Sequence, residues 1–160
     1  YLIGMMSCGK TTLGKELAKI SGRKFLDADK YIEEREGRSI PQMFAEGEEV
    51  FRAAERRAML DIANMNNVVV ATGGGAVLSE INRDAMRMSG TVIYVDRSVE
   101  KIVSHVDCGG RPLLAGGAER LYEIYGARKH LYESCAHFII KNNEGVQQGL
   151  YAIREALNEN

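Results

Sequence analysis

Apolar residues gather in short runs along the chain, and between these runs the apolar positions recur at helical spacing. The runs predict five strands, which are Tyr1–Ile3, Lys24–Leu26, Asn67–Thr72, Thr91–Val95 and Phe138–Ile140. The segments between them predict eight helices, which are Lys10–Ile20, Lys30–Glu36, Ser39–Ala45, Glu49–Asn64, Ser79–Met88, Val99–His105, Glu119–Glu133 and Val146–Leu157. Most of the strands are apolar without strict alternation, which is typical of strands covered on both faces. The alternation therefore predicts an α/β three-layer sandwich, in which a five-stranded parallel sheet carries helices on both faces.

Length and charge narrow the class of protein. A chain of 160 residues suits one domain with its own core, so we expect a single domain over residues 1–160. The net charge of −1 provides no overall field to attract nucleic acid or a membrane surface, so any anion site must be local. No apolar run approaches the ~18 residues that span a bilayer. We expect neither nucleic acid nor a membrane as a partner, and we expect a monomer.

The three cysteines bear on the compartment. Cys8, Cys108 and Cys135 are odd in number and have no zinc-site spacing. Reduced thiols in a cytoplasmic protein are the simplest interpretation. The chain opens at Tyr1 inside a predicted strand, so we expect a few residues before it, and these leave a targeting segment open.

The strongest motif is "GMMSCGKT" at residues 4–11, a G-x-x-x-x-G-K-T pattern that follows an apolar strand and opens a helix. In this context the backbone N–H groups and the helix N-terminus form a nest for phosphates. Lys10 is expected to reach the β- and γ-phosphates of ATP, and the Thr11 hydroxyl to ligate Mg²⁺. The alternative is a glycine-rich turn that binds nothing.

Ser7 stands where many such loops carry another glycine, which is acceptable if Ser7 does not need a positive φ. The predicted nucleotide contacts are Ser7, Cys8, Gly9, Lys10, Thr11 and Thr12.

A phosphate loop alone does not separate kinases from GTPases, motors or switches. The chain is too short for a large ATPase, and it lacks an NKxD-like motif for reading guanine. A kinase of small molecules fits the length.

Two carboxylates follow the second predicted strand. Asp27 and Asp29 are expected at the carboxyl edge of the sheet, where ligands bind in open α/β folds. One carboxylate can hold Mg²⁺ through water while the other orients or deprotonates an acceptor hydroxyl. The alternative for Asp29 is an N-cap of the following helix.

Two further patterns are ambiguous by themselves. Arg52, Glu55 and Arg56 share one helix face, which taken alone favours a solvated charged surface. The triplet Gly73, Gly74 and Gly75 ends a predicted strand, and it fits a tight turn, a second phosphate loop or one wall of a substrate pocket.

The order of these motifs resembles the shikimate kinases. After the phosphate loop come D-x-D, "EGRSI", F-R-x-x-E, "GGGAV", "RPLL" and R-x-x-L-Y, in the order of that family and through nearly the whole chain. Gluconate and adenylate kinases share the phosphate loop but not this later series. The resemblance implies a P-loop NTPase-type fold and the ATP-dependent phosphorylation of the shikimate 3-hydroxyl, a step toward chorismate and the aromatic amino acids.

The resemblance also implies roles for individual residues in the acceptor site. Asp29 would bind the substrate hydroxyls, as a base or only as an orienting group. Asp27 would lie near Mg²⁺, through water. Arg52 and Arg128 would clamp the shikimate carboxylate, and Glu55 would help to fix the same pocket.

The resemblance extends to the glycine triplet and to a lid. The triplet Gly73–Gly75 would form one wall of the shikimate pocket, with the backbone of Gly74 offered to the substrate. Arg111, from "RPLL", would belong to a lid near residues 107–118, contact the nucleotide and reach the transferring phosphate. A substrate-binding segment would span residues 30–58. Lys10, Asp29 and Arg111 would then form the catalytic set.

Some positions depart from the family. "FAEGEEVF" is one residue short, which affects where Arg52 is placed. Ser104 and His105 replace a basic residue that stacks on adenine, and Lys141 and Asn142 replace an Asp-Thr pair, so we expect weaker or altered ATP binding. These changes leave two rival functions open. One is a kinase for another polyol acid, and the other is a non-catalytic nucleotide-binding module with a regulatory role.

Overall fold

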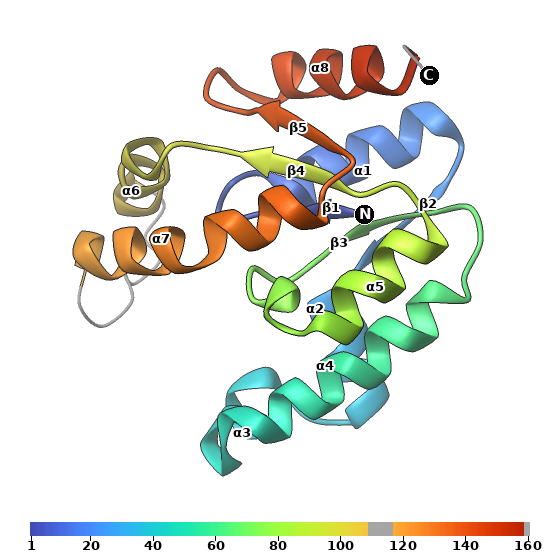
Figure 1. Cartoon of the computed structure of the whole chain (residues 1–160), viewed down its shortest axis with the longest axis vertical. Helices are drawn as coiled ribbons and strands as arrows, with labels where there is room; N and C mark the ends of the chain where they lie inside the picture. The colour runs from blue at the N-terminus through green and yellow to red at the C-terminus, as the bar shows by residue number, and fades with distance from the viewer. Residues whose placement is uncertain (109–116, 159–160) are drawn as a thin grey trace.

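The computed structural model describes residues 1–108 and 117–158, and within them five parallel strands form one sheet in the order β2-β3-β1-β4-β5 (Figure 1). The strands are β1 (Leu2–Ile3), β2 (Lys24–Asp27), β3 (Val68–Ala71), β4 (Ile93–Asp96) and β5 (Phe138–Lys141). Every neighbouring pair is parallel. Each strand lies where the sequence predicts one, so the prediction of a parallel α/β sheet is confirmed.

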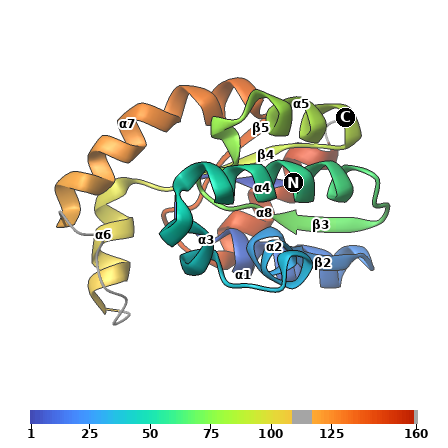
Figure 2. The same cartoon turned by 90° about the horizontal axis from the view of Figure 1, so that it is seen from below.

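Helices cover both faces of the sheet (Figures 1 and 2). On one face lie α1 (Lys10–Ser21) and α8 (Val146–Asn158), and on the other lie α5 (Glu80–Ser89) and α7 (Gly117–Cys135). The remaining elements are α2 (Ala28–Glu36), α3 (Ile40–Glu46), α4 (Glu48–Ala63), α6 (Val99–Cys108) and a 3₁₀ turn, η1 (Ala76–Leu78). All eight predicted helices are present in the described chain, and η1 is the element that the sequence pattern missed. Its three residues are too few to show a helical period.

The segment that holds α2, α3 and α4 has a small core of its own, separate from the main core beneath the sheet. It consists of Ile32, Met43, Phe51, Ala54 and Ala58, all buried. This core fixes α4 against α2, and α4 also packs on α5. The predicted substrate-binding segment at residues 30–58 therefore folds as a helical unit beside the sheet.

Local sequence explains why the chain turns sharply within this segment. Ser39 Oγ accepts a hydrogen bond from the Gln42 amide, and the Gln42 side chain accepts one from the Ser39 amide, which forms a capping box at the start of α3. Gly47 ends α3 with a φ of 141°, a conformation open to glycine, and α4 begins at the next residue. The junction between the two helices is therefore a single residue, Gly47, five positions before Arg52.

Parallel strands bring all five carboxyl ends to one edge of the sheet. The phosphate loop leaves β1 there, Asp27 ends β2, and the glycine triplet follows β3. Arg97 and Asn142 follow β4 and β5 at the same edge. The fold thus collects most of the predicted site residues in one place. Arg111 and most of the predicted lid lie outside the described residues. Among the described helices, none is both long enough and apolar enough to cross a membrane.

Candidate active site

The phosphate loop connects β1 to α1 and folds around its own lysine. Lys10 Nζ donates to the carbonyl oxygens of Gly4 at 2.9 Å and Met5 at 2.6 Å, and the Lys10 side chain is buried. The first amides of α1 have no helical carbonyl to bond, so they remain available to an anion. The loop is therefore an anion nest with a cation beneath it. The contact of Lys10 with nucleotide phosphates stays a prediction.

Ser7 corrects one expectation. It has a φ of +58°, so the condition under which a serine was acceptable here, that no positive φ is needed, is not met. For a residue with a Cβ this conformation costs about 1–2 kcal/mol. The loop thus keeps its curvature with a serine in a position that favours glycine, at some cost in stability.

A cavity of about 450 Å³ opens beside the loop, which is within the range of ligand sites. Its wall includes the loop residues Ser7, Gly9, Lys10, Thr11 and Thr12, together with Arg97, His105, Val106, Asn142, Gly145 and Val146. Size, position and loop amides fit the phosphates of a nucleotide. His105 is exposed and also lines this cavity.

The two replaced positions at the end of β5 both make contacts. Asn142 is buried, and its Nδ2 donates to the carbonyl oxygen of Cys8 at 2.8 Å, which ties β5 to the phosphate loop. Lys141 forms an ion pair with the buried Asp96, which also accepts a hydrogen bond from Tyr94 at 3.0 Å. Weaker or altered ATP binding stays a prediction for these two positions, and in the fold their side chains hold the phosphate loop and the sheet edge.

The D-x-D pair divides its work between a cap and the pocket. Asp27 Oδ1 accepts from the amides of Asp29 at 3.1 Å and Lys30 at 3.3 Å, so Asp27 is the N-cap of α2. The alternative that made Asp29 the cap is wrong. Asp29 lies in the first turn of α2. Burial, together with the charge of Asp27, raises the pKa of its carboxyl. The positive charges of Lys10 and Arg52 act in the opposite direction.

Arg52 and Glu55 form a largely buried ion pair on α4. Arg52 Nη1 lies 2.9 Å from Glu55 Oε2, and the two side chains are only 12% and 2% exposed. Arg56 faces away and pairs with Glu49 instead. The interpretation as a solvated surface therefore holds for Arg56 and is wrong for the other two. Burial raises the pKa of Glu55, and the guanidinium of Arg52 opposes that rise.

The glycine triplet lies between these groups and the phosphate loop. A Cβ atom at Gly73 would lie 2.7 Å from Asp29 Oδ1, and one at Gly75 would lie 2.6 Å from Arg52 Nη2. Gly74 faces the loop instead, since a Cβ atom there would lie 3.3 Å from the backbone nitrogen of Met6. The triplet is followed by η1 rather than by a longer helix, which excludes a second phosphate loop. It is a turn whose missing side chains leave room for Asp29 and Arg52.

α7 completes the site with Arg128 and with a residue that the prediction did not assign. Tyr132 is fully buried, and its hydroxyl donates to the carbonyl oxygen of Gly74 at 2.6 Å. Burial raises the pKa of Tyr132 to about 12, while the charge of Arg128 acts against that rise. Burial raises the pKa of Glu55, and the charge of Arg128 acts against that rise as well, so Arg128 lies near enough to α4 to influence this carboxyl. The tyrosine of the R-x-x-L-Y motif was the available signal for Tyr132.

Two residues of the site fit a magnesium ion. Thr11 and Asp27 both line a cleft beside the phosphate loop. Within the described residues, no group of three or more histidine, cysteine, aspartate or glutamate side chains forms a metal cage. Mg²⁺ rarely needs such a cage, because it is commonly held by one or two protein oxygens, water and substrate phosphates.

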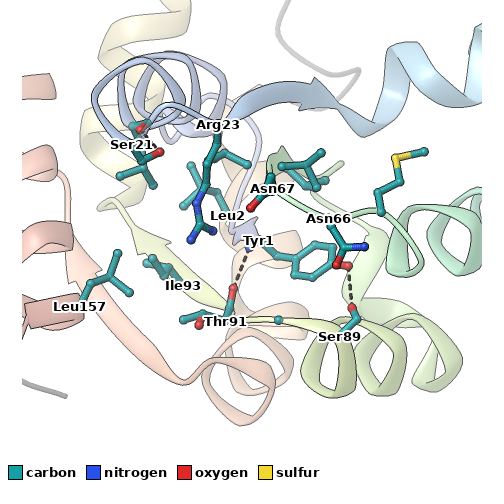
Figure 3. Close-up of a pocket in the computed structure, with 16 residues that line it drawn as sticks. Tyr1, Leu2, Ser21, Arg23, Asn66, Asn67, Ser89, Thr91, Ile93 and Leu157 are labelled. Carbon is teal, nitrogen blue, oxygen red and sulfur yellow. Dashed lines mark hydrogen bonds between the residues drawn. The ribbon is translucent and has the colours of Figure 1, made fainter.

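Another cavity, of about 380 Å³, opens at the amino edge of the sheet (Figure 3). It is lined by Tyr1, Arg23, Asn67 and Thr91 among others, and Arg23 is the one charged side chain among the described residues that line it. None of the predicted site residues that the structure describes lines this cavity. Those residues gather at the carboxyl edge instead.

The parallel sheet, the phosphate loop and the neighbouring pocket of carboxylates and arginines define a phosphate-loop kinase of small molecules. The family model described as shikimate kinase matches residues 6–158, so the chain belongs to the shikimate kinase family. The resemblance inferred from the motif order is thereby confirmed.

Similar proteins agree over the whole chain. A shikimate kinase of Clostridium botulinum (strain Alaska E43 / Type E3) is 40% identical over 160 residues, covering 100% of this chain and 97% of that protein. The structure of shikimate kinase from Acinetobacter baumannii in complex with shikimate is 35% identical, with a TM-score of 0.89 over 99% of this chain and 91% of that one. Shikimate kinase from Aquifex aeolicus is 32% identical, with a TM-score of 0.86 over 99% and 95%.

Proposed function

We propose that this chain transfers the γ-phosphoryl group of ATP to the 3-hydroxyl of shikimate, giving shikimate 3-phosphate and ADP on the route to chorismate. The observation that carries the proposal is the glycine triplet, which lies against the phosphate loop through Gly74 and against Asp29 and Arg52 through its outer glycines. A phosphate donor and a hydroxylated acid bound on either side of this turn would be close enough to react.

The acceptor half of the site matches a hydroxylated carboxylic acid. Arg52 on α4 and Arg128 on α7 supply two guanidiniums, and a guanidinium binds a carboxylate through two parallel hydrogen bonds. Glu55 holds Arg52 in orientation by the bond at 2.9 Å. We assign the carboxylate of shikimate to these two arginines and its hydroxyls to Asp29. The glycine triplet would form one wall of this pocket.

The raised pKa of Asp29 suits a group that accepts a proton or a hydrogen bond from a hydroxyl. Phosphoryl transfer depends mainly on positioning and charge neutralisation, so Asp29 can contribute by orienting the 3-hydroxyl without removing its proton. Lys10 neutralises charge from beneath the loop. Thr11 and, through water, Asp27 would hold Mg²⁺, which would supply further positive charge to the phosphates. Arg111, outside the described residues, is assigned to the same task from the lid.

The proposal also covers the domain organisation, the oligomeric state, the substrates and the location of the protein. It acts as a single kinase domain and as a monomer, with shikimate and ATP as its partners. A cytoplasmic location is supported by Cys8 and Cys135, both free thiols in the described chain.

The decisive measurement is ADP release from MgATP by the purified protein, with and without shikimate. We expect turnover that depends on shikimate. ATP binding without such turnover would overturn the proposal. Turnover with a different hydroxylated acid would then indicate the rival acceptor, and no turnover with any such acid would indicate the non-catalytic module.

The clamp is tested by Arg52→Lys and Arg128→Ala, with Arg154→Ala as the matched control because Arg154 is exposed on α8. Lysine at position 52 keeps the charge beside buried Glu55 but loses the planar fork. We expect both clamp variants to raise the KM for shikimate about 10- to 100-fold, each factor of ten being ~1.4 kcal/mol, with little change in the KM for ATP. Equal effects on both substrates would contradict the assignment.

A further inference from the structure

Arg97 is a cation at the nucleotide cavity that the motif series does not include. It follows directly after β4, at the carboxyl edge of the sheet, and it lines the same cavity as Gly9, Lys10 and Thr11. Its Nη1 atom lies 3.5 Å from the carbonyl oxygen of Ser7. A hydrogen bond of this length is weak, so the contact alone does not explain the position of the side chain.

The charge of Arg97 has no anionic partner within the described part of the chain. Among those residues it forms no ion pair, and its buried Nε has no hydrogen-bond acceptor. The neighbouring carboxylate of Asp96 is already engaged by Lys141 and by the Tyr94 hydroxyl. Buried donors of a guanidinium are normally paired, so this side chain is prepared for an acceptor that comes from a ligand.

The location of Arg97 determines which part of a bound nucleotide it could contact. Ser7 belongs to the loop whose amides cradle the α- and β-phosphates. Arg97 Nη1 lies beside Ser7 of that loop, so its guanidinium lies on the phosphate side of the cavity. Its planar fork matches two phosphate oxygens.

We propose that Arg97 binds the β-phosphate of the nucleotide, as a cation additional to Lys10. This inference rests on the proposed function, because it takes the cavity beside the loop as the nucleotide site. The positive charge of Arg97 at the end of β4 would add binding energy on the phosphate side of the ligand. It would thereby compensate for the absence of a basic residue at Ser104.

The test compares the binding of ADP and AMP to the intact protein, by calorimetry or by competition. The variants are Arg97→Gln and Arg97→Lys, with Arg154→Gln as the control. We expect Arg97→Gln to weaken ADP binding about tenfold or more, ~1.4 kcal/mol, and to leave AMP binding within about twofold. Arg97→Lys should lie between it and the wild type, because the charge is kept and the fork is lost. The KM for shikimate should not change.

Two outcomes overturn the inference. Equal weakening of ADP and AMP would show that Arg97 only braces the loop through Ser7, and unchanged ADP binding would show that it has no role. If Arg97→Gln does not fold, the ratio of ADP to AMP affinity in Arg97→Lys decides. A wild-type protein that binds ADP but shows no shikimate-dependent turnover would refute the proposed function and leave the assignment of Arg97 intact.

Discussion

Replacing Gly75 with alanine adds one methyl group directly against the carboxylate clamp. Gly75 has a φ of −94° and a ψ of 0°, a conformation that any L-residue adopts, so the backbone gains no strain. The new Cβ atom would lie 2.6 Å from Nη2 and 2.7 Å from Nη1 of Arg52, whereas ordinary contact begins at 3.4 Å. The guanidinium must therefore move by the difference between 3.4 and 2.6 Å, about 0.8 Å.

The cost of this movement should fall on shikimate and spare the fold. The guanidinium of Arg52 is the end of a flexible side chain, so it can move without shifting the backbone. We therefore expect the free energy of unfolding to fall by less than about 1 kcal/mol. Its bond to buried Glu55 at 2.9 Å restricts where it can go. A displacement of about 1 Å in a positioning group costs up to ~100-fold in rate. We therefore expect kcat/KM for shikimate to fall about 10- to 100-fold, with the KM for ATP within about twofold.

The assay is steady-state ADP release with each substrate varied in turn. Gly126→Ala is the matched control, because it makes the same change on α7 where a Cβ atom meets nothing within 4 Å. Alanine inside a helix should stabilise the control by up to ~1 kcal/mol and leave both KM values unchanged. A Gly75→Ala enzyme with normal kcat/KM for shikimate would refute the placement of Arg52 in the clamp. Gly74→Val is a poorer test, since its side chain would meet the phosphate loop and disturb both substrates.

Three further changes test the site. Burial and the charge of Asp27 raise the pKa of Asp29, so activity is lost as pH falls through that raised pKa; Asp27→Asn should move the acid limb of kcat/KM for shikimate to lower pH, and an unmoved limb would contradict this coupling. Tyr132→Phe leaves the carbonyl of Gly74 without its donor, so urea unfolding should show a loss of about 1–3 kcal/mol; an unchanged free energy of unfolding would mean that another donor replaces the hydroxyl. Ser7→Gly relieves a positive φ and should raise the free energy of unfolding by up to about 1 kcal/mol, whereas Ser7→Val should lower it; a more stable valine variant would refute the strain argument.

The two aspartates of the D-x-D pair show how far sequence reasoning reaches. Spacing after a buried strand predicted that both would lie at the carboxyl edge, because a parallel sheet gathers those ends. It did not decide which carboxylate caps α2. That depends on the direction in which the chain leaves β2, and this direction gives the cap to Asp27 and leaves Asp29 at the pocket.

Arg52 and Arg56 make the same point on a helix. Their spacing of four residues predicts one shared face, and no rule of periodicity separates them. Packing separates them, because α4 places Arg52 against Gly75 and beside buried Glu55, while Arg56 pairs with Glu49. Arg97 and Tyr132 were missed for a related reason, since neither makes its contact with a neighbour in the sequence.

The class of fold, the phosphate loop and the family follow from the amino-acid sequence. These depend on hydrophobic periods, on a nest built from consecutive residues and on the order of short motifs, all of which are local or additive along the chain. Which side chains share the pocket depends instead on how the elements pack. Asp29, Arg52, Tyr132 and Arg97 come from different elements, and their contacts exist only after the sheet has brought its carboxyl ends together. Burial then raises the pKa values of Asp29 and Tyr132, and burial is a property of the packed chain.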